Sequence, residues 1–180
     1  SRAILDRNDK TIRDLGGIDD QIDARQEHFL RFLGRLGEKR LTSRQQKSLN
    51  SYVGVVNLVE NLGDLIDHRF QQLGQDLIDL NSVMSKETAK AFAELTKLVE
   101  AAFAATIDKM AADSTGSAGR VFEAERKVRK FARESKSALS MRLANRSEER
   151  LRIFRIEIDL IECQAQMAYL LAEMAREIES

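Results

Sequence analysis

Apolar residues recur along this chain in alternating steps of three and four positions, the spacing of one face of an α-helix. The longest such stripe consists of Leu49, Tyr52, Val56, Val59, Gly63, Ile66, Phe70, Leu73, Leu77 and Leu80. At the rise of an α-helix these residues span about 45 Å, which is too long for a compact globular helix. The pattern therefore predicts an elongated helical bundle.

Similar stripes predict five helices in all, over residues 4–36, 42–80, 86–112, 120–143 and 147 to the end. The stripe of the first consists of Ile12, Leu15, Ile18, Ile22, Phe29, Phe32 and Leu36. Its Gly16-Gly17 pair predicts a kink, and Gly37 is expected to end it in a left-handed conformation. The third and fourth stripes consist of Phe92, Leu95, Val99, Phe103, Ile107 and Met110, and of Val121, Val128, Phe131, Leu139 and Leu143.

Helix starts and one linker can also be read from the chain. Thr42 followed by Gln45 predicts a capping box, and Ser85 and Ser147 are expected to cap the third and last helices. Residues 113–119 are small and polar, which indicates the linker between the third and fourth helices. Short connections of this kind favour antiparallel, up-and-down packing.

The last helix carries two adjacent apolar seams. One consists of Ile153, Ile156, Leu160, Cys163, Met167, Leu170 and Met174, and the other of Leu151, Phe154, Ile158, Ile161, Ala165, Ala168 and Ala172. Together they make a broad apolar face. We expect this helix to contact two neighbours at once.

Composition supports an all-α fold. The chain has no proline, the residue that most strongly breaks helices, and it lacks the Gly, Pro and Asn-Gly turn signals of a sheet. Its 29 basic and 29 acidic residues give a formal net charge of zero, which argues against a nucleic-acid partner. A local basic block consists of Arg120, Arg126, Lys127, Arg129, Lys130, Arg133 and Lys136. We interpret it as a solvated helix face; contact with phosphate, anionic lipid or protein is the alternative.

Little in the sequence points to catalysis. The single cysteine, Cys163, lies in an apolar helical run, so we expect a small core residue and not a nucleophile. With two histidines and no phosphate-binding glycine loop, the parts of a catalytic site are missing, and we expect no enzymatic activity. No apolar run is long enough to span a bilayer. The first residues resemble neither a signal peptide nor a natural start, which suggests a piece of a larger protein.

The second helix aligns with the last when it is moved by 102 residues. Val56 then meets Ile158 and Glu60 meets Glu162, as expected for two duplicated helical hairpins. Residues 57–67, Asn-Leu-Val-Glu-Asn-Leu-Gly-Asp-Leu-Ile-Asp, resemble the signature of PhoU proteins, in which Leu-Glu-Arg-Ile-Gly-Asp is typical. Residues 18–23, Ile-Asp-Asp-Gln-Ile-Asp, resemble the Asp/Glu-x-Ile-Asp stretch of the preceding PhoU helix.

The resemblance covers about residues 5–177 and is greatest to the PhoU-like tail of bacterial sodium/phosphate cotransporters. It implies two three-helix repeats, over residues 1–82 and 83–180, with the opening helix of the first repeat truncated or located before residue 1. The implied function is a regulatory domain on the cytoplasmic side of the inner membrane. Its partner would be a transporter domain, in the same or another protein; a homodimer stays open.

The resemblance also implies a metal site. PhoU proteins hold iron or zinc clusters on acidic motifs, and the matching positions here are Asp20, Asp23, Glu60 and Asp64. Glu60, Asp64 and Asp67 are spaced to share one helical face, and converging carboxylates can bind such cations. The alternative is a set of solvated acids that pair with Lys or Arg. A second site is not expected, because the last helix has Gln166 and Tyr169 where Asp64 and Asp67 stand.

Two other functions stay open from the sequence. One is a helical scaffold or adaptor with no link to phosphate. The other is a standalone metal-binding PhoU homologue that regulates a phosphate ABC transporter.

Overall fold

The computed structural model describes residues 2–6, 8–13, 16–81, 83–111, 116–141 and 147–179, and every regular element in these ranges is a helix. Two short helices, α1 (Arg2–Leu5) and α2 (Asp9–Arg13), come first. The long elements are α3 (Gly16–Gly37), α4 (Ser43–Asp64), a π-helical segment η1 (Leu65–Gln71), α5 (Gln72–Asp79), α6 (Lys86–Ala111), α7 (Gly116–Met141) and α8 (Glu148–Glu179). The prediction of an all-α bundle is confirmed.

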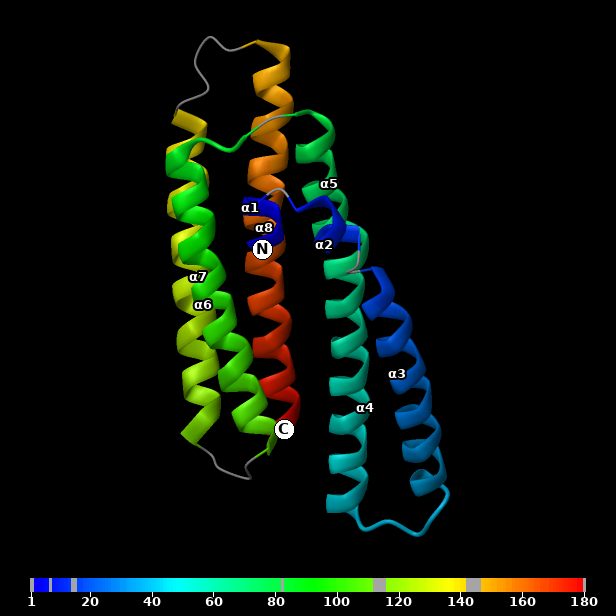
Figure 1. Ribbon diagram of the computed structural model, residues 1–180. Helices are drawn as coiled ribbons and strands as arrows, with labels where there is room; N and C mark the ends of the chain where they lie inside the picture. Colours follow the sequence, from blue (N-terminus) through cyan, green and yellow to red (C-terminus); the bar gives the residue numbers. More distant parts are fainter. Residues whose placement is uncertain are drawn as a thin grey trace.

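The bundle is built around α8, which packs against α4 on one side and against α6 and α7 on the other (Figure 1). The α3 helix lies on the outer side of α4 and packs mainly against it, so that the α3–α4 hairpin stands at the edge of the molecule (Figure 1). One continuous core joins residues of α4, η1, α5, α6, α7 and α8. The boundary at residue 82 between two repeats therefore stays a prediction.

The first predicted helix is not continuous, and that expectation was wrong. The chain ends α1 at Leu5 and starts α2 after Asn8, whose side-chain oxygen accepts a hydrogen bond from the backbone N–H of Thr11 at 3.0 Å. Asparagine is a strong N-cap, so it starts a new helix where the apolar pattern alone suggested a single long one. The kink predicted at Gly16-Gly17 stays a prediction, because α3 begins at Gly16 and residues 14 and 15, Leu15 among them, lie outside the described residues.

Two short helices before α3 have a specific packing partner. Ile4 and Ile12 are buried against Gly74 of α5, where a Cβ atom would meet the Cγ1 of Ile4 at 2.9 Å and the Cδ1 of Ile12 at 3.4 Å. Glycine at this position lets the N-terminal segment approach the backbone of α5 closely. In Figure 1 α2 lies beside α5 and above the start of α3.

The cap predictions are mostly correct. Thr42 accepts a hydrogen bond from the backbone N–H of Gln45 and donates its own backbone N–H to the Gln45 side chain, which completes the capping box. Ser85 and Ser147 accept hydrogen bonds from the N–H groups three residues later, as expected. These local signals are short-range hydrogen bonds, which is why sequence alone predicts them.

Two boundary predictions were wrong. Gly37 is the last residue of α3 and is not left-handed; no glycine in the described ranges has a positive φ, whereas Asn81, with φ 47°, has this conformation after α5. The predicted linker at 113–119 is shorter than expected, because α7 already begins at Gly116. Residues 113–115 lie outside the described ranges, as do Ala112 and Leu143.

The long stripe of the second predicted helix does not continue in phase. The buried residues are Val55, Leu62 and Leu65, and the next is Phe70, five positions later; Leu73 and Leu77 then follow at steps of three and four. The five-residue step coincides with η1, in which each backbone hydrogen bond spans one residue more than in an α-helix. The π segment therefore brings two apolar stripes that are one residue out of phase onto the same core.

The stripes of α6 and α8 show where side-chain size decides the packing. Phe92, Leu95 and Val99 of α6 are buried as predicted, but the stripe then continues through Ala102 and Thr106. The predicted Ile107 and Met110 are exposed. Small residues let α6 approach its neighbours closely, which turns the larger side chains outward. In α8 every predicted member of the first seam is buried, and in the second only Leu151 is exposed.

The phase shift at η1 yields a prediction. Deletion of the exposed His68 converts the five-residue step into a four-residue step, which a regular α-helix accommodates, so the free energy of unfolding should change by no more than about 1 kcal/mol. Deletion of the equally solvent-facing Asn57 of α4 rotates one half of the stripe away from the core and should cost about 3 kcal/mol. Urea unfolding followed by circular dichroism measures both. Equal destabilisation by the two deletions would contradict this account of η1.

Candidate functional site

The acidic positions from the PhoU-like motif lie on α3 and α4, two helices that pack against each other. The side chain of Gln26 in α3 donates a hydrogen bond to the Glu60 carboxylate in α4, which places Glu60 at this contact. Asp20 and Asp23 lie nearer the start of α3, and Asp64 lies one turn after Glu60 in the antiparallel partner helix. Glu60 is half-buried, whereas Asp20, Asp23 and Asp64 are exposed to solvent.

The structure adds His68, the residue that follows Asp67 in the chain. Its Nδ1 lies 3.6 Å from the Asp64 carboxylate and 3.9 Å from that of Asp67. Because residues 65–71 form the π segment, Asp67 is rotated relative to the face that a regular helix would share with Asp64. Across the described ranges, no group of three His, Cys, Asp or Glu side chains is arranged to hold a metal ion.

A second feature of the same hairpin is an apolar groove, referred to below as the α3/α4 groove. Its volume is about 570 Å³, and it is lined by Ile22, Arg25, Gln26, Phe29, Phe32, Leu33, Tyr52, Val55, Val56, Val59 and Met110. Met110 belongs to the end of α6, so residues from three helices surround the groove. Phe29 is 55 % exposed and Tyr52 is 59 % exposed, large fractions for aromatic side chains that share one cavity.

The groove follows from the arrangement of the hairpin. The stripes of α3 and α4 are wider than the contact between these two helices, so part of each stripe stays uncovered. We expected Phe29, Phe32, Tyr52 and Val59 to be core residues, and the structure leaves all four exposed. A comparison of stripe width with the number of neighbouring helices is the signal that could have revealed the groove from sequence.

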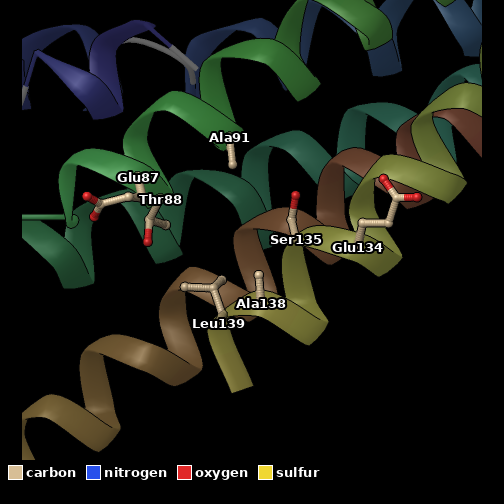
Figure 2. Close-up of a pocket in the computed structure, with 7 residues that line it drawn as sticks. All are labelled: Glu87, Thr88, Ala91, Glu134, Ser135, Ala138 and Leu139. Carbon is tan, nitrogen blue, oxygen red and sulfur yellow. The ribbon is translucent and has the colours of Figure 1, made fainter. Parts of the chain in front are cut away.

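A smaller depression lies between α6 and α7 (Figure 2). It has a volume of about 240 Å³, and small residues on the two helices, Ala91, Ser135 and Ala138, leave the space open. Glu87 and Glu134 flank it, and their carboxylates point away from each other in Figure 2. None of the seven lining residues is a histidine, cysteine or cation, so this depression lacks the paired groups of a nucleophilic site.

Polar groups inside the bundle connect the helices around α8. The side-chain amide of Gln164 donates a hydrogen bond of 2.6 Å to the Thr96 hydroxyl of α6, and Thr96 in turn donates to the carbonyl of Phe92. Buried Glu157 lies 3.6 Å from Arg150. The contact between Gln164 and Thr96 fixes the register between α6 and α8, because a shift along the helix axis would separate these polar partners. The pair of Glu157 and Arg150 lies within α8.

Cys163 is a core residue, as the sequence predicts. Its side chain is fully buried, and burial raises the pKa of the thiol to about 11, against an ordinary value of 9.0. The nearby carboxylates of Asp159 and Glu162 raise this pKa further, while Arg69 lowers it. A thiol with so high a pKa is a poor nucleophile at neutral pH.

The basic block on α7 is a solvated face with acidic neighbours. Lys127 lies 2.7 Å from Glu123, and this hydrogen bond holds the pKa of the Glu123 carboxyl below its ordinary value. Arg129 pairs with Glu125, and Lys136 pairs with Glu162 of α8 at 2.8 Å. These ion pairs agree with the interpretation of a solvated helix face.

Comparison with known proteins gives no match to a family model, to a curated protein or to a solved structure. Within the described residues, every helix is too short or too polar to cross a membrane.

The burial of Cys163 predicts its reactivity. At pH 8 a pKa of about 11 in place of 9.0 lowers the thiolate fraction by about a hundredfold, so iodoacetamide should label the native protein far more slowly than the protein in guanidinium. Mass spectrometry of timed samples measures the labelling. Because the unfolded thiol ionises first, the free energy of unfolding should also fall as pH rises from about 9 toward 11. Labelling of native and unfolded protein at one rate would show that Cys163 is accessible.

Metal binding at the acidic positions stays a prediction with a direct test. The wild-type protein and the Glu60→Ala/Asp64→Ala variant are each incubated with Fe³⁺ or Zn²⁺, desalted and measured by elemental analysis. If the acidic positions Asp20, Asp23, Glu60 and Asp64 hold a metal ion, the wild-type protein retains about one ion per chain and the variant does not. Equal metal contents in the two proteins would end the hypothesis.

Proposed function

We propose that this chain is a helical regulatory domain that binds a protein partner, and that the partner is a membrane transporter for phosphate. The proposal places the domain on the cytoplasmic side of the inner membrane, where it modulates phosphate uptake through protein contacts. It includes no catalytic step.

The α3/α4 groove is the observation that carries the binding role. Contiguous exposed apolar surface is costly in water and marks interaction sites in many proteins. Here four large apolar side chains gather on one hairpin, at the edge of the bundle, around a cavity of about 570 Å³. The α8 helix, in contrast, is covered on several sides by its neighbours. The uncovered apolar surface of the α3/α4 groove therefore needs an explanation.

The link to phosphate rests on the PhoU-like motif. Residues 57–67 span the junction of α4 and η1, and residues 18–23 lie near the start of α3. The hydrogen bond between Gln26 and Glu60 supports the proposal in so far as it places one motif residue, Glu60, at the contact between these two helices. This arrangement of an acidic hairpin followed by a second hairpin is what the resemblance to the sodium/phosphate cotransporter tail implies.

A helical adaptor without a link to phosphate is the second candidate. The groove favours it equally, because an apolar surface can bind a helix of any partner and carries no feature specific to phosphate. A standalone PhoU homologue that acts on an ABC transporter would additionally need the metal site, so the elemental analysis above bears on it.

The transport role can be tested in cells. An in-frame deletion of the coding region for this domain should change the initial rate of sodium-dependent ³²P-phosphate uptake by about twofold or more, because the regulatory contacts are lost. Uptake of an unrelated sodium-coupled solute, such as proline, serves as the control and should stay constant. If phosphate uptake is the same with and without the domain at both low and high external phosphate, the proposed transport role is wrong.

A further inference from the structure

The two hairpins of this molecule share some apolar positions in sequence but differ in their surroundings. The shift of 102 residues that aligns α4 with α8 also aligns α3 with α7, and it brings Phe29 onto Phe131 and Tyr52 onto Phe154. In the second hairpin, α6 packs against both α7 and α8. In the first hairpin the α3/α4 groove lies in the corresponding place, and among its lining residues only Met110, at the end of α6, comes from outside α3 and α4.

Exposure at matched positions shows the difference. Val59 is 37 % exposed, whereas its counterpart Ile161 is 1 % exposed. Phe29 and Tyr52 are exposed, whereas Phe131 and Phe154 are partly buried against the core. These three apolar positions are therefore shared by both hairpins and are less exposed in the second one, in which α6 packs against both α7 and α8. Phe32, Leu33 and Val55 of the groove have polar counterparts instead, Glu134, Ser135 and Glu157.

The surface area of the chain is large enough for a further partner. The chain exposes 11159 Å², while a compact monomer of 20.4 kDa exposes about 8,800 Å². A typical stable complex buries about 800 Å² on each partner. The elongated shape accounts for part of the excess, and the groove provides an apolar surface on which such an interface can form.

The charge in the groove indicates the chemistry of the occupant. Arg25 is the single charged residue among the eleven that line it, and no ion pair of Arg25 is seen within the described ranges. The polar Gln26 beside it is already hydrogen-bonded to Glu60. A carboxylate at the flank of an incoming helix would complement Arg25, while its apolar face would cover the aromatic side chains.

We propose that the α3/α4 groove binds a single amphipathic helix of a partner protein. This helix has apolar residues spaced as in α6 and an acidic residue on its flank that pairs with Arg25. The lining residues of α3, from Ile22 to Leu33, extend over about 16 Å, which corresponds to three turns of the bound helix. The inference rests on the proposed function in that it names the partner class, but it requires no link to phosphate.

A labelled peptide with the sequence of residues 86–111 serves as the probe, because α6 has the required apolar spacing and carries Glu94 and Glu100 on its exposed side. Fluorescence anisotropy with the complete 180-residue chain should show saturable binding with a Kd of about 10 µM. Absence of saturable binding at about ten times that concentration overturns the proposal.

Variants in the groove distinguish two events: binding of the probe peptide in the groove, and replacement of the chain's own α6 by the probe. Tyr52→Glu and Val59→Glu should each weaken binding by about tenfold or more, because they place a charge on the apolar floor of the groove. Tyr169→Glu is the matched control: Tyr169 is 51 % exposed on α8 and does not line the groove, so its variant should bind within about twofold of wild type. Equal loss in all three variants overturns the proposal. Thermal melts verify that each variant is folded, and Phe32→Glu replaces any that is not.

A double-mutant cycle tests whether Arg25 pairs with an acidic residue of the bound helix. Arg25→Ala should weaken binding of the probe by about fivefold, and it should have little further effect on a probe in which Glu94, Glu100 and Asp108 are replaced by Gln or Asn. If Arg25→Ala weakens both probes equally, the acidic part of the proposal is wrong.

Sedimentation of the free chain tests the alternative that a second copy of this chain occupies the groove. A monomer is expected across the concentrations of the binding assay. A dimer that Val59→Glu dissociates would show that a second copy occupies the groove, and this outcome overturns the proposal.

Groove-dependent binding of the probe together with unchanged phosphate uptake would refute only the transport role. A transport effect without groove-dependent binding would refute only this inference.

Discussion

The burial of α8 is the constraint on which the rest of the structure depends. Its two apolar seams together cover most of the helix circumference, and burying such a surface contributes far more than any single polar contact in the molecule. One neighbouring helix cannot cover it. α6 and α7 therefore pack on one side and α4 on the other, and the order of the chain then makes the connections antiparallel.

This requirement is met differently by the two hairpins. α7 and α6 both contact α8 directly, whereas in the first hairpin only α4, η1 and α5 reach it, and α3 remains on the outside. The apolar stripes before and after η1 are one residue out of phase, and η1 brings both onto the same core by its five-residue step from Leu65 to Phe70. The ring of Phe70 stacks on that of Phe92 in α6, with 6.1 Å between the ring centroids. This contact connects the two hairpins inside the core. The groove is what remains on the side of the first hairpin that α6 reaches only at Met110 among the lining residues.

Much of this fold is encoded in short-range patterns. The helical nature of every long element, the three caps and the two seams of α8 follow from side-chain spacing and from hydrogen bonds within four residues, so they could be predicted. The predicted contact between the acidic motif and the preceding helix is also consistent with the position of Glu60 opposite Gln26. Its use as a metal site could not be deduced, because ligand geometry depends on the rotation of Asp67 and His68 in the π segment. The groove was missed for a related reason: an apolar residue on a helix face looks the same in sequence whether or not a neighbour covers it.

The amino-acid sequence by itself determined that the chain forms long amphipathic helices, where most of them begin, and that the last one must be central. These properties depend on local hydrogen bonds and on the periodicity of apolar residues, which act over a few positions. Only the tertiary structure decided that Ile107 and Met110 turn outward while Ala102 and Thr106 turn inward, and that Phe29 and Tyr52 remain exposed. The physical reason is that close packing depends on the size of side chains on neighbouring helices and on the number of neighbours. Both are set by the whole bundle and not by any one segment.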